Sequence, residues 1–359
     1  MKRIFFYHLL NDFSGSPKVL RQIILNVQKE EVEIVLNTSE SQRGFLSDIT
    51  GVSLEGNSYT FYDNKILRLF ALCFSQFLGF LRALVKFKKE DIVYINTLLP
   101  FGAALAAKIK GSTLIYHIHE NSIKPKILMW FLVKVASITA TEIIYVSNYV
   151  RDELNINHAK ESVIYNAIDR AFLSNMDLDE KCNKQKRVLM VCSLKFYKGV
   201  VEFVELARSL SNYSFDLVLN ASQEEVRKFE TQQDIPSNLL CYAKQENLHP
   251  FYKQADLVLN LSHPDLWVET FGLTVLEAMF YGKPTIVPPV GGVMEIVKED
   301  ESSYCISVKN LKLIQSKIEA LLNDNNLYSK FSKNAREKAQ EFLPEQFDLA
   351  ISERFKAYS

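Results

Sequence analysis

The sequence predicts an α/β protein made of two Rossmann-like domains. Its length of 359 residues exceeds what a single hydrophobic core usually serves, since domains typically hold about 100–200 residues. In both halves, short β-branched or aromatic runs alternate with helical patterns, which is typical of βα units and a parallel sheet. A polar segment without clear periodicity, 171–186, separates the halves and predicts a linker.

The first half contains five expected strands, each followed by a helical pattern. We expect strands at 3–8, 31–38, 91–96, 113–119 and 142–147, and helices beginning near Pro17, Lys65, Phe101, Lys124 and Asn148. Ser16 is expected to cap the first helix, with Pro17 at the first helical position.

The second half repeats this alternation. Strands are expected at 187–192, 215–220, 239–242, 257–261 and 284–287, and helices from about Gly199, over 274–281 and within 311–342. Pro344 interrupts the chain before a last amphipathic segment. We therefore expect an N-terminal domain over 1–170, a C-terminal domain over 187–343, and a final helix over 344–359 that rejoins the N-terminal domain.

Composition excludes several classes of protein. The 42 basic and 42 acidic residues cancel, so the positive field of a nucleic-acid binder is absent. The five scattered cysteines lack a C-x-x-C pair and predict neither a disulfide framework nor a zinc site: Cys73, Cys182, Cys192, Cys241 and Cys305. The apolar run at 4–10 is too short for a secretory signal. These features favour a reducing cytoplasm and no membrane span.

The most informative segment is 255–297, which contains Glu269 and Glu277 with seven residues between them. An expected strand precedes the pair, Phe271 and Gly272 form a turn, and a helix follows, which is where parallel α/β sheets bind ligands. A helix N-terminus with a close-approaching glycine suits a diphosphate. Gly291-Gly292 supplies a second close-approach loop.

The order E-x7-E, EAM-x-x-G-x-P and GG-x-x-E-I-V in this segment resembles the retaining GT-B enzymes of glycosyltransferase family 4. Lys198-Gly199 resembles the K-G turn of that family, and IYNAID at 164–169 resembles its segment before the linker. The resemblance implies a GT-B fold, in which two Rossmann-like domains face each other across a deep cleft and the C-terminal helix crosses back to the N-terminal domain.

The resemblance also implies roles for individual residues. Glu277 would hold the ribose hydroxyls of a nucleotide, Glu269 would face the transferred sugar, and Lys198 would neutralise the diphosphate. Backbone groups of Phe271, Gly272 and Leu273 would line the donor pocket. Gly15 and His119, on the acceptor-binding N-terminal domain, would close over it.

The implied reaction is a retaining, front-face transfer of a hexose-type sugar from a nucleoside diphosphate, with UDP favoured. The acceptor would be a glycan or lipid-linked molecule of cell-surface polysaccharide or lipopolysaccharide biosynthesis. Stabilising a departing diphosphate needs fixed cations and amides, so no metal and no cofactor are expected. The only near match to a D-x-D motif, Asp177-Leu178-Asp179, lies in the linker and is expected to be solvated surface.

One position departs from the family. Where the family carries an arginine in a G-R-L run, this chain has Ser193, and Lys195 is close enough in sequence to replace the missing cation. A lysine lacks the bidentate fork of arginine. One alternative is therefore a weakly active or inactive subunit that binds nucleotide sugar, and another is a nucleotide-sugar epimerase on the same fold.

Several of these residues also have purely structural interpretations. Thr274 and Glu277 are spaced as a capping box, so Glu277 would then only close its own helix. His117 and His119 share one face of a strand, where histidines are often structural partners.

Two segments predict contact with an anionic membrane surface, and hence a peripheral location on the inner face of a membrane. Residues 65–89 contain six basic and no acidic residues around an apolar centre that is itself too short to span a bilayer, and 124–135 adds Trp130 and three lysines. An apolar body with basic ends suits an interfacial helix. The alternative is a pair of buried helices with solvated ends.

Overall fold

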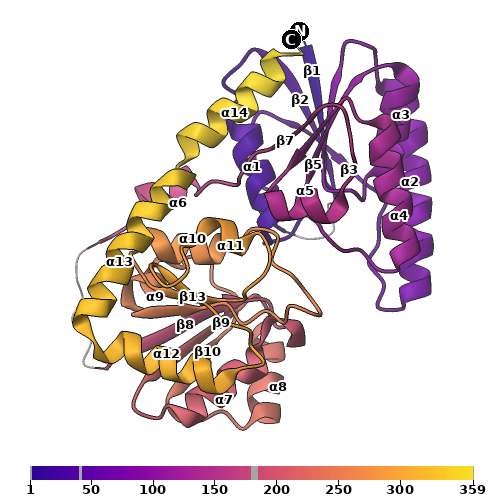
Figure 1. Ribbon diagram of the computed structural model, residues 1–359. Coiled ribbons are helices and arrows are strands. Elements are labelled where there is room, and N and C mark those ends of the chain that lie inside the picture. Colours follow the sequence, from indigo (N-terminus) through magenta and orange to yellow (C-terminus); the bar gives the residue numbers. More distant parts are fainter. Residues whose placement is uncertain (1, 40–42, 179–184, 359) are drawn as a thin grey trace. The chain divides into compact units, whose positions relative to one another are not determined.

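The computed structural model describes residues 2–39, 43–178 and 185–358, which form two compact units (Figure 1). The first unit comprises Met1–Asn166 and Glu345–Ser359, and the second comprises Ala167–Pro344. Each unit holds one parallel sheet flanked by helices. The predicted class, α/β with two Rossmann-like domains, is confirmed.

The sheet of the first unit has seven parallel strands in the order β3-β2-β1-β4-β5-β6-β7. The strand order reverses between β1 and β4, as in dinucleotide-binding folds. The strands are β1 Lys2–Tyr7, β2 Val32–Thr38, β3 Ser53–Gly56, β4 Ile92–Asn96, β5 Thr113–Ile118, β6 Glu142–Tyr145 and β7 Glu161–Val163.

Helices cover both faces of this sheet (Figure 1). Because side chains alternate along a strand, Phe5 and Tyr7 face a layer made of α2 Lys65–Lys86, α3 Phe101–Lys110 and α4 Lys126–Thr139. Phe6 faces the opposite way and contacts Phe355 of α14 Pro344–Lys356. The remaining helices of this unit are α1 Gly15–Val27 and α5 Asn148–Leu154.

The sheet of the second unit has six parallel strands in the order β10-β9-β8-β11-β12-β13, with the reversal between β8 and β11. The strands are β8 Arg187–Cys192, β9 Ser214–Leu219, β10 Leu239–Tyr242, β11 Leu257–Leu259, β12 Thr285–Val287 and β13 Ser303–Cys305. This order again provides a switch point at the carboxyl edge of the sheet, where ligands bind in such folds.

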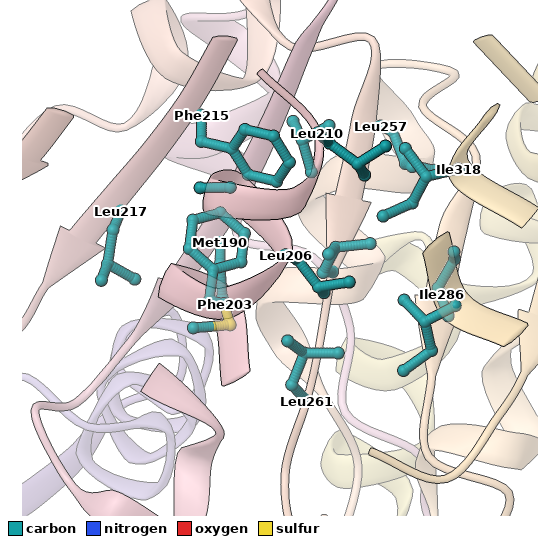
Figure 2. Packing of buried hydrophobic residues seen from close by; sticks show 14 of the residues in the cluster. Met190, Phe203, Leu206, Leu210, Phe215, Leu217, Leu257, Leu261, Ile286 and Ile318 are labelled. Atoms are coloured by element: carbon teal, nitrogen blue, oxygen red, sulfur yellow. The ribbon is translucent and has the colours of Figure 1, made fainter. Parts of the chain in front are cut away.

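The core of the second unit packs its strands against α7 Val200–Ser209 and α12 Leu311–Asn323, and it also includes Val226, Phe229 and Phe331 from two other helices. Figure 2 shows members of this cluster from different elements, among them Phe203 of α7, Met190 of β8 and Ile318 of α12. The other helices are α6 Arg170–Ser174, α8 Gln223–Gln233, α9 His249–Gln254, α10 Leu273–Phe280, α11 Val293–Ile296 and α13 Asn325–Ala339, with 3₁₀ turns η1 Phe196–Lys198 and η2 Gln340–Phe342.

The structure differs from the sequence-based expectations at several element ends. Ser16 is not the cap of α1, because the helix begins at Gly15 and Ser14 occupies the N-cap. The hydroxyl of Ser14 instead donates to Asp12 at 2.5 Å. The helical stretch 311–342 is divided at Asp324, whose side chain caps α13 by accepting from two backbone N–H groups.

Candidate functional site

The candidate site of the second unit lies at the carboxyl edge of its sheet, on either side of the switch point. Lys198 ends the turn η1 that follows β8, and Glu269 lies in the loop after β11. These two strands are neighbours in the sheet, so the fold brings together two residues that are 71 positions apart in sequence.

Lys198 and Glu269 form an ion pair whose side chains are 15% and 16% exposed. Ser262 Oγ donates a hydrogen bond to the same carboxylate oxygen, Glu269 Oε1, at 2.8 Å. The Lys198 ammonium also lies 5.2 Å from the centre of the Trp267 ring, a distance suited to a cation–π contact. The pair is therefore a fixed and largely buried arrangement of charges.

Glu269 stays ionised in this environment. Burial by itself raises the pKa of the Glu269 carboxyl, but the charge of Lys198 and the hydrogen bonds from Lys198, Ser262 and Asn260 together hold that pKa below its usual value. An ionised carboxylate accepts hydrogen bonds on both oxygens. Glu269 is thus suited to bind a hydroxyl of a sugar.

Two glycines allow the backbone around this pair to pack closely. Gly199 has φ +77°, and a Cβ there would lie 2.3 Å from the carbonyl oxygen of Leu261. Gly291 has φ +105°, and a Cβ there would lie 2.4 Å from the carbonyl oxygen of Glu269. Gly292 N–H donates to that same carbonyl at 2.8 Å. The K-G turn and the G-G loop therefore both fix the main chain that carries Glu269 and Ser262.

Helix α10 begins directly after this loop. Gly272 is its N-cap residue, with φ +103° and no side-chain cap, and Leu273 is its first residue. Phe271 is buried against Phe342 with ring centres 5.8 Å apart, so the turn presents its backbone while its aromatic side chain anchors it. The free N–H groups at the N-terminus of α10 form the end of the helix at which an anion is stabilised.

Glu277 does not close a capping box. Thr274 lies inside α10, one position after Leu273, and the helix has no side-chain cap. The Glu277 side chain, in a residue only 3% exposed, instead accepts a hydrogen bond from Tyr252 Oη at 2.8 Å. The capping interpretation was wrong because the backbone of Gly272 begins the helix two residues before Thr274.

Ser193 and Lys195 follow β8 but differ in their surroundings. Ser193 is half-buried, and its carbonyl accepts from the Lys195 N–H at 2.8 Å. Lys195 is exposed, and its charge helps to lower the pKa of Glu225 near the start of α8, after the two hydrogen bonds from Ser222.

The first unit holds a second polar cluster at the carboxyl edge of its own sheet. His119 Nε2 lies 3.0 Å from Asn96 Oδ1, and Asn96 Nδ2 donates to the carbonyl of Ser16 at 3.0 Å. Asn96 thus connects His119, after β5, to the first turn of α1, which begins at Gly15. Burial, then His117 and His8, lower the pKa of His119, so the imidazole is neutral and serves as a hydrogen-bonding group.

His117 has a structural partner, since Tyr94 Oη lies 2.7 Å from its Nδ1 in the core. Burial lowers the pKa of His117 to about 3. Residues of these clusters that were missed from the sequence include Asn96, Tyr252, Asn260, Ser262 and Trp267. Asn96 and Asn260 carry the available signal, since each is a polar residue at the end of an apolar run.

The residues considered for other chemistry lie apart from these clusters. Asp177 pairs with Lys253, and Leu178 is exposed, while Asp179 and Cys182 lie outside the described residues. Within 2–39, 43–178 and 185–358, no group of three or more His, Cys, Asp or Glu side chains is arranged to hold a metal ion.

Comparison with known proteins identifies the family. Residues 13–172 match the model of glycosyltransferase family 4, and residues 177–338 match that of the glycosyl transferases group 1. The capsular polysaccharide biosynthesis glycosyltransferase CapM of Staphylococcus aureus is 23% identical over 327 residues, which is 82% of this chain and 85% of CapM. An N,N′-diacetylbacillosaminyl-diphospho-undecaprenol alpha-1,3-N-acetylgalactosaminyltransferase of Campylobacter jejuni is 28% identical over 176 residues, 48% of this chain and 43% of that enzyme.

The chain spans about half the length of several curated relatives that it matches, namely 55%, 49% and 43% of three of them. The fold match is complete. The crystal structure of Anabaena HepE in complex with UDP-glucose covers 99% of this chain and 100% of its own, with a TM-score of 0.79 and 18% identity. Two family models covering successive halves and a GT-B neighbour over the full length agree. The chain therefore belongs to the group 1 glycosyltransferases, with a family 4 domain in its first half and a GT-B fold.

Proposed function

We propose that this glycosyltransferase moves a sugar from a nucleoside diphosphate, with UDP favoured, to a hydroxyl of a glycan or lipid-linked acceptor in cell-surface polysaccharide or lipopolysaccharide synthesis, with retention of configuration. The observation that carries the proposal is the ion pair of Lys198 with Glu269 at the switch point, beside the helix that carries Glu277. The Lys198 ammonium and the helix N-terminus suit the diphosphate. The ionised Glu269 carboxylate suits a sugar hydroxyl, and Glu277 suits the ribose of the nucleotide.

In this proposal the residues act mainly by electrostatics. Lys198 and the N–H groups of Gly272 and Leu273 stabilise the charge that develops on the diphosphate as the glycosidic bond breaks. Glu269 orients the sugar through its hydroxyls, and Glu277 holds the ribose hydroxyls. The acceptor hydroxyl attacks from the face that the diphosphate leaves, and its proton passes to the departing diphosphate oxygen. His119 and Gly15 stay predicted contacts on the sugar side, and no metal or cofactor takes part.

The names of relatives support the choice of donor and acceptor. HepE was crystallised with UDP and with UDP-glucose, which favours a UDP-sugar. CapM is named for capsular polysaccharide synthesis, and the Campylobacter enzyme is named for a diphospho-undecaprenol substrate. These names favour an acceptor attached to a lipid.

A product assay distinguishes this function from the alternatives. The full chain is incubated with UDP-, GDP- and ADP-sugars, with and without lipid-linked acceptors, and the products are resolved by NMR of the anomeric proton. A transfer product with retained anomeric configuration, which the Glu269→Ala variant no longer forms, supports the proposal. A free, modified sugar formed without acceptor would instead identify an epimerase, and binding without any turnover would identify an inactive subunit.

We also propose that the first unit binds an anionic membrane surface through α2 and α4. Helix α2 places polar side chains among its buried positions and large apolar side chains on its outward face. Its buried positions include the polar Ser75 and Gln76, and Gln76 Oε1 accepts from the Gly102 N–H at 3.1 Å. Its outward positions are large and apolar, including Phe70, Phe74, Phe77 and Val85, which are 69%, 62%, 58% and 86% exposed.

The chemistry of this face favours lipid as its partner. On α4, Ile127 and Trp130 are 74% and 68% exposed, and α2 and α4 both pack against α3 (Figure 1). Along the chain, basic residues flank and interrupt the apolar runs of these two segments: Lys65, Arg68, Arg82, Lys86, Lys88, Lys89, Lys124, Lys126 and Lys134, of which Lys86 pairs with Glu55. A basic rim around an apolar centre is expected of an interfacial helix, and the protein is then cytoplasmic and peripheral.

The alternative of two buried helices is wrong for the outward faces, because these side chains are exposed. The whole helix is longer than the apolar centre that was judged too short to span a bilayer. The helix has 22 residues, which is about 33 Å at 1.5 Å per residue. Among the described helices, only α2 is long and apolar enough to cross a membrane, with mean hydropathy 1.5. Its packing on α3 favours an interfacial position.

Flotation with vesicles tests the membrane proposal. We expect the full chain to float with phosphatidylglycerol vesicles at low salt, and less with phosphatidylcholine vesicles. Phe70→Gln/Phe74→Gln is expected to abolish flotation, whereas Leu240→Gln, at a position 54% exposed in the second unit, serves as the control. A wild-type protein that stays in solution contradicts the proposal. So does a dimer in sedimentation that the α2 variant dissociates, since a second copy would then cover this face.

A further inference from the structure

Tyr252 is a fully buried tyrosine whose hydroxyl is directed at the carboxylate of Glu277. It lies on α9, its exposed fraction is 0%, and its Oη donates to Glu277 Oε2 at 2.8 Å. Burial and the Glu277 carboxylate raise the pKa of Tyr252 well above its ordinary value, so the hydroxyl stays a donor. A hydrogen bond to an ionised acceptor in a buried site is stronger than one between neutral groups.

The ring of Tyr252 is held by other aromatic side chains. It stacks on Tyr281 with centres 6.0 Å apart and an angle of 20°, and it meets the edge of Phe172 at 6.1 Å. Tyr281 Oη lies 2.8 Å from His249 Nδ1 at the start of α9. These contacts would hold a phenylalanine equally well, so packing does not account for the hydroxyl.

We propose that Tyr252 is a positioning residue that sets the direction in which the Glu277 carboxylate meets the ribose hydroxyls of the nucleotide. The proposal rests on the ribose role of Glu277 in the proposed function. A carboxylate on an eight-residue helix turns about its own side-chain bonds, and a fixed bond to one oxygen fixes the direction of the other. Such support of a binding group by a neighbour is what holds a site in its productive geometry.

The test uses nucleotides that differ only at the ribose. UDP and 2′,3′-dideoxy-UDP are titrated calorimetrically against the wild type, Tyr252→Phe and the control Tyr242→Phe. Tyr242 Oη also donates to a carboxylate, that of Asp216, at 3.3 Å, but it lies at the edge strand β10. We expect Tyr252→Phe to weaken UDP about tenfold, as for one lost hydrogen bond to a charged group, and to leave dideoxy-UDP unchanged.

The affinities for UDP and dideoxy-UDP are compared within each variant. A general loss of folded protein would weaken the binding of both nucleotides and would therefore not imitate the expected result. Equal losses for UDP and dideoxy-UDP in Tyr252→Phe would show a purely structural role and overturn the proposal. A wild type that does not discriminate between the two nucleotides would overturn the ribose role of Glu277 itself, and this inference with it.

Two further measurements separate positioning from catalysis. In steady-state assays we expect Tyr252→Phe to raise the KM for the donor with little change in kcat, because ribose binding is the same in the ground and transition states. In a Glu277→Ala background the effect of Tyr252→Phe on UDP affinity is expected to vanish. An undiminished effect in that background would contradict a role exerted through Glu277.

Discussion

At the scale of single residues, the site depends on opposing effects on Glu269. Burial disfavours its charge, while Lys198 and the hydrogen bonds from neighbouring side chains favour it, and the result is a carboxyl whose pKa lies below its usual value. Lys198 is the largest of the favourable influences. Its removal leaves a buried carboxylate without its partner, which is unfavourable for the charged form.

Lys198→Met should therefore change the pH dependence of donor hydrolysis as well as its rate. We expect kcat to fall about a hundredfold, as when one group that stabilises transition-state charge is removed, and the acid limb of the pH–rate profile to move to higher pH. Lys198→Arg, which keeps the charge, should leave the acid limb near its wild-type position. An acid limb that does not move in Lys198→Met would contradict the coupling.

Glu120, in the first unit, gives a pH effect on stability of the opposite sign to that of an ordinary salt-bridged carboxylate. Burial raises the pKa of Glu120 to about 7, despite a bond from the Leu98 N–H and other donors. The folded protein thus retains a proton that the unfolded chain releases, so the stabilisation is complete below the ordinary pKa of 4.5 and is lost as pH rises through about 7.

Glu120→Gln imitates the protonated form and should remove this dependence. The free energy of unfolding in urea is measured near pH 5 and pH 8 for both the variant and the wild type. The comparison is needed because the buried His8, His117 and His119 have lowered pKa values. In both proteins these histidines change stability with pH in the direction opposite to Glu120. We expect the variant to gain stability relative to the wild type at the higher pH. An equal difference at both pH values would contradict the assignment.

Sequence patterns revealed those site residues that carry local signals. Lys198 precedes a glycine, Glu269 precedes the Phe271-Gly272 turn, and Glu277 lies in the helix that follows it. Tyr252 has no such signal, since its partner Glu277 lies 25 positions away. Asn96 stands out only as a polar residue at a strand end, which does not reveal its partner His119, 23 positions away. Their roles depend on which strands become neighbours, which is a property of the folded sheet.

At the scale of elements, the central strands and the edge strand β10 were predicted well, and the other three edge strands were not. β8 and β10 were placed at Arg187–Cys192 and Leu239–Tyr242 as expected, because β-branched and apolar runs mark them. The strands β3, β7 and β13 were missed. Each is short and lies at the end of its sheet, where one side has no neighbouring strand and a long apolar run is not needed.

Two glycines illustrate how the same substitution acts differently in different elements. Gly199→Ala should destabilise the protein by about 1–3 kcal/mol, because φ is +77° and the new Cβ would meet the Leu261 carbonyl. Gly79→Ala, inside α2 with no atom within 4 Å of the new Cβ, should stabilise it by about 0.5–1 kcal/mol. Urea unfolding of both variants checks the pair, and destabilisation by Gly79→Ala would contradict the helical environment assigned to it.

At the scale of the whole molecule, the chain leaves the first unit after Asn166 and returns to it at Glu345. The returning helix α14 is attached by Glu142, a residue of β6 that is 1% exposed. Arg354 Nε lies 3.3 Å from Glu142 Oε1, and Tyr358 Oη donates to Glu142 Oε2 at 2.9 Å. The return of the final helix, expected from the break at Pro344, depends on these contacts and on the stacking of Phe355 on Tyr94 at 5.6 Å.

Arg354→Ala should destabilise the first unit by about 1–3 kcal/mol, because it removes a charged partner from a buried carboxylate. Lys356→Ala is the matched control on the same helix, since Lys356 lies 4.0 Å from the exposed Glu30, and such surface pairs contribute about 0–1 kcal/mol. Thermal unfolding monitored by near-ultraviolet circular dichroism measures both. Equal effects of the two substitutions would contradict the role of Glu142 as the attachment point.

The most direct test of the central claim, that Lys198 and Glu277 bind the nucleoside diphosphate, is calorimetric titration of UDP into the full chain and its Lys198→Ala, Glu277→Ala and Lys228→Ala variants. Lys228 is a control because its side chain is 68% exposed and pairs with Glu224 on the same helix surface. We expect the first two variants to lose about tenfold or more in affinity and Lys228→Ala to bind as the wild type does. Unchanged affinity in Lys198→Ala and Glu277→Ala would contradict the account.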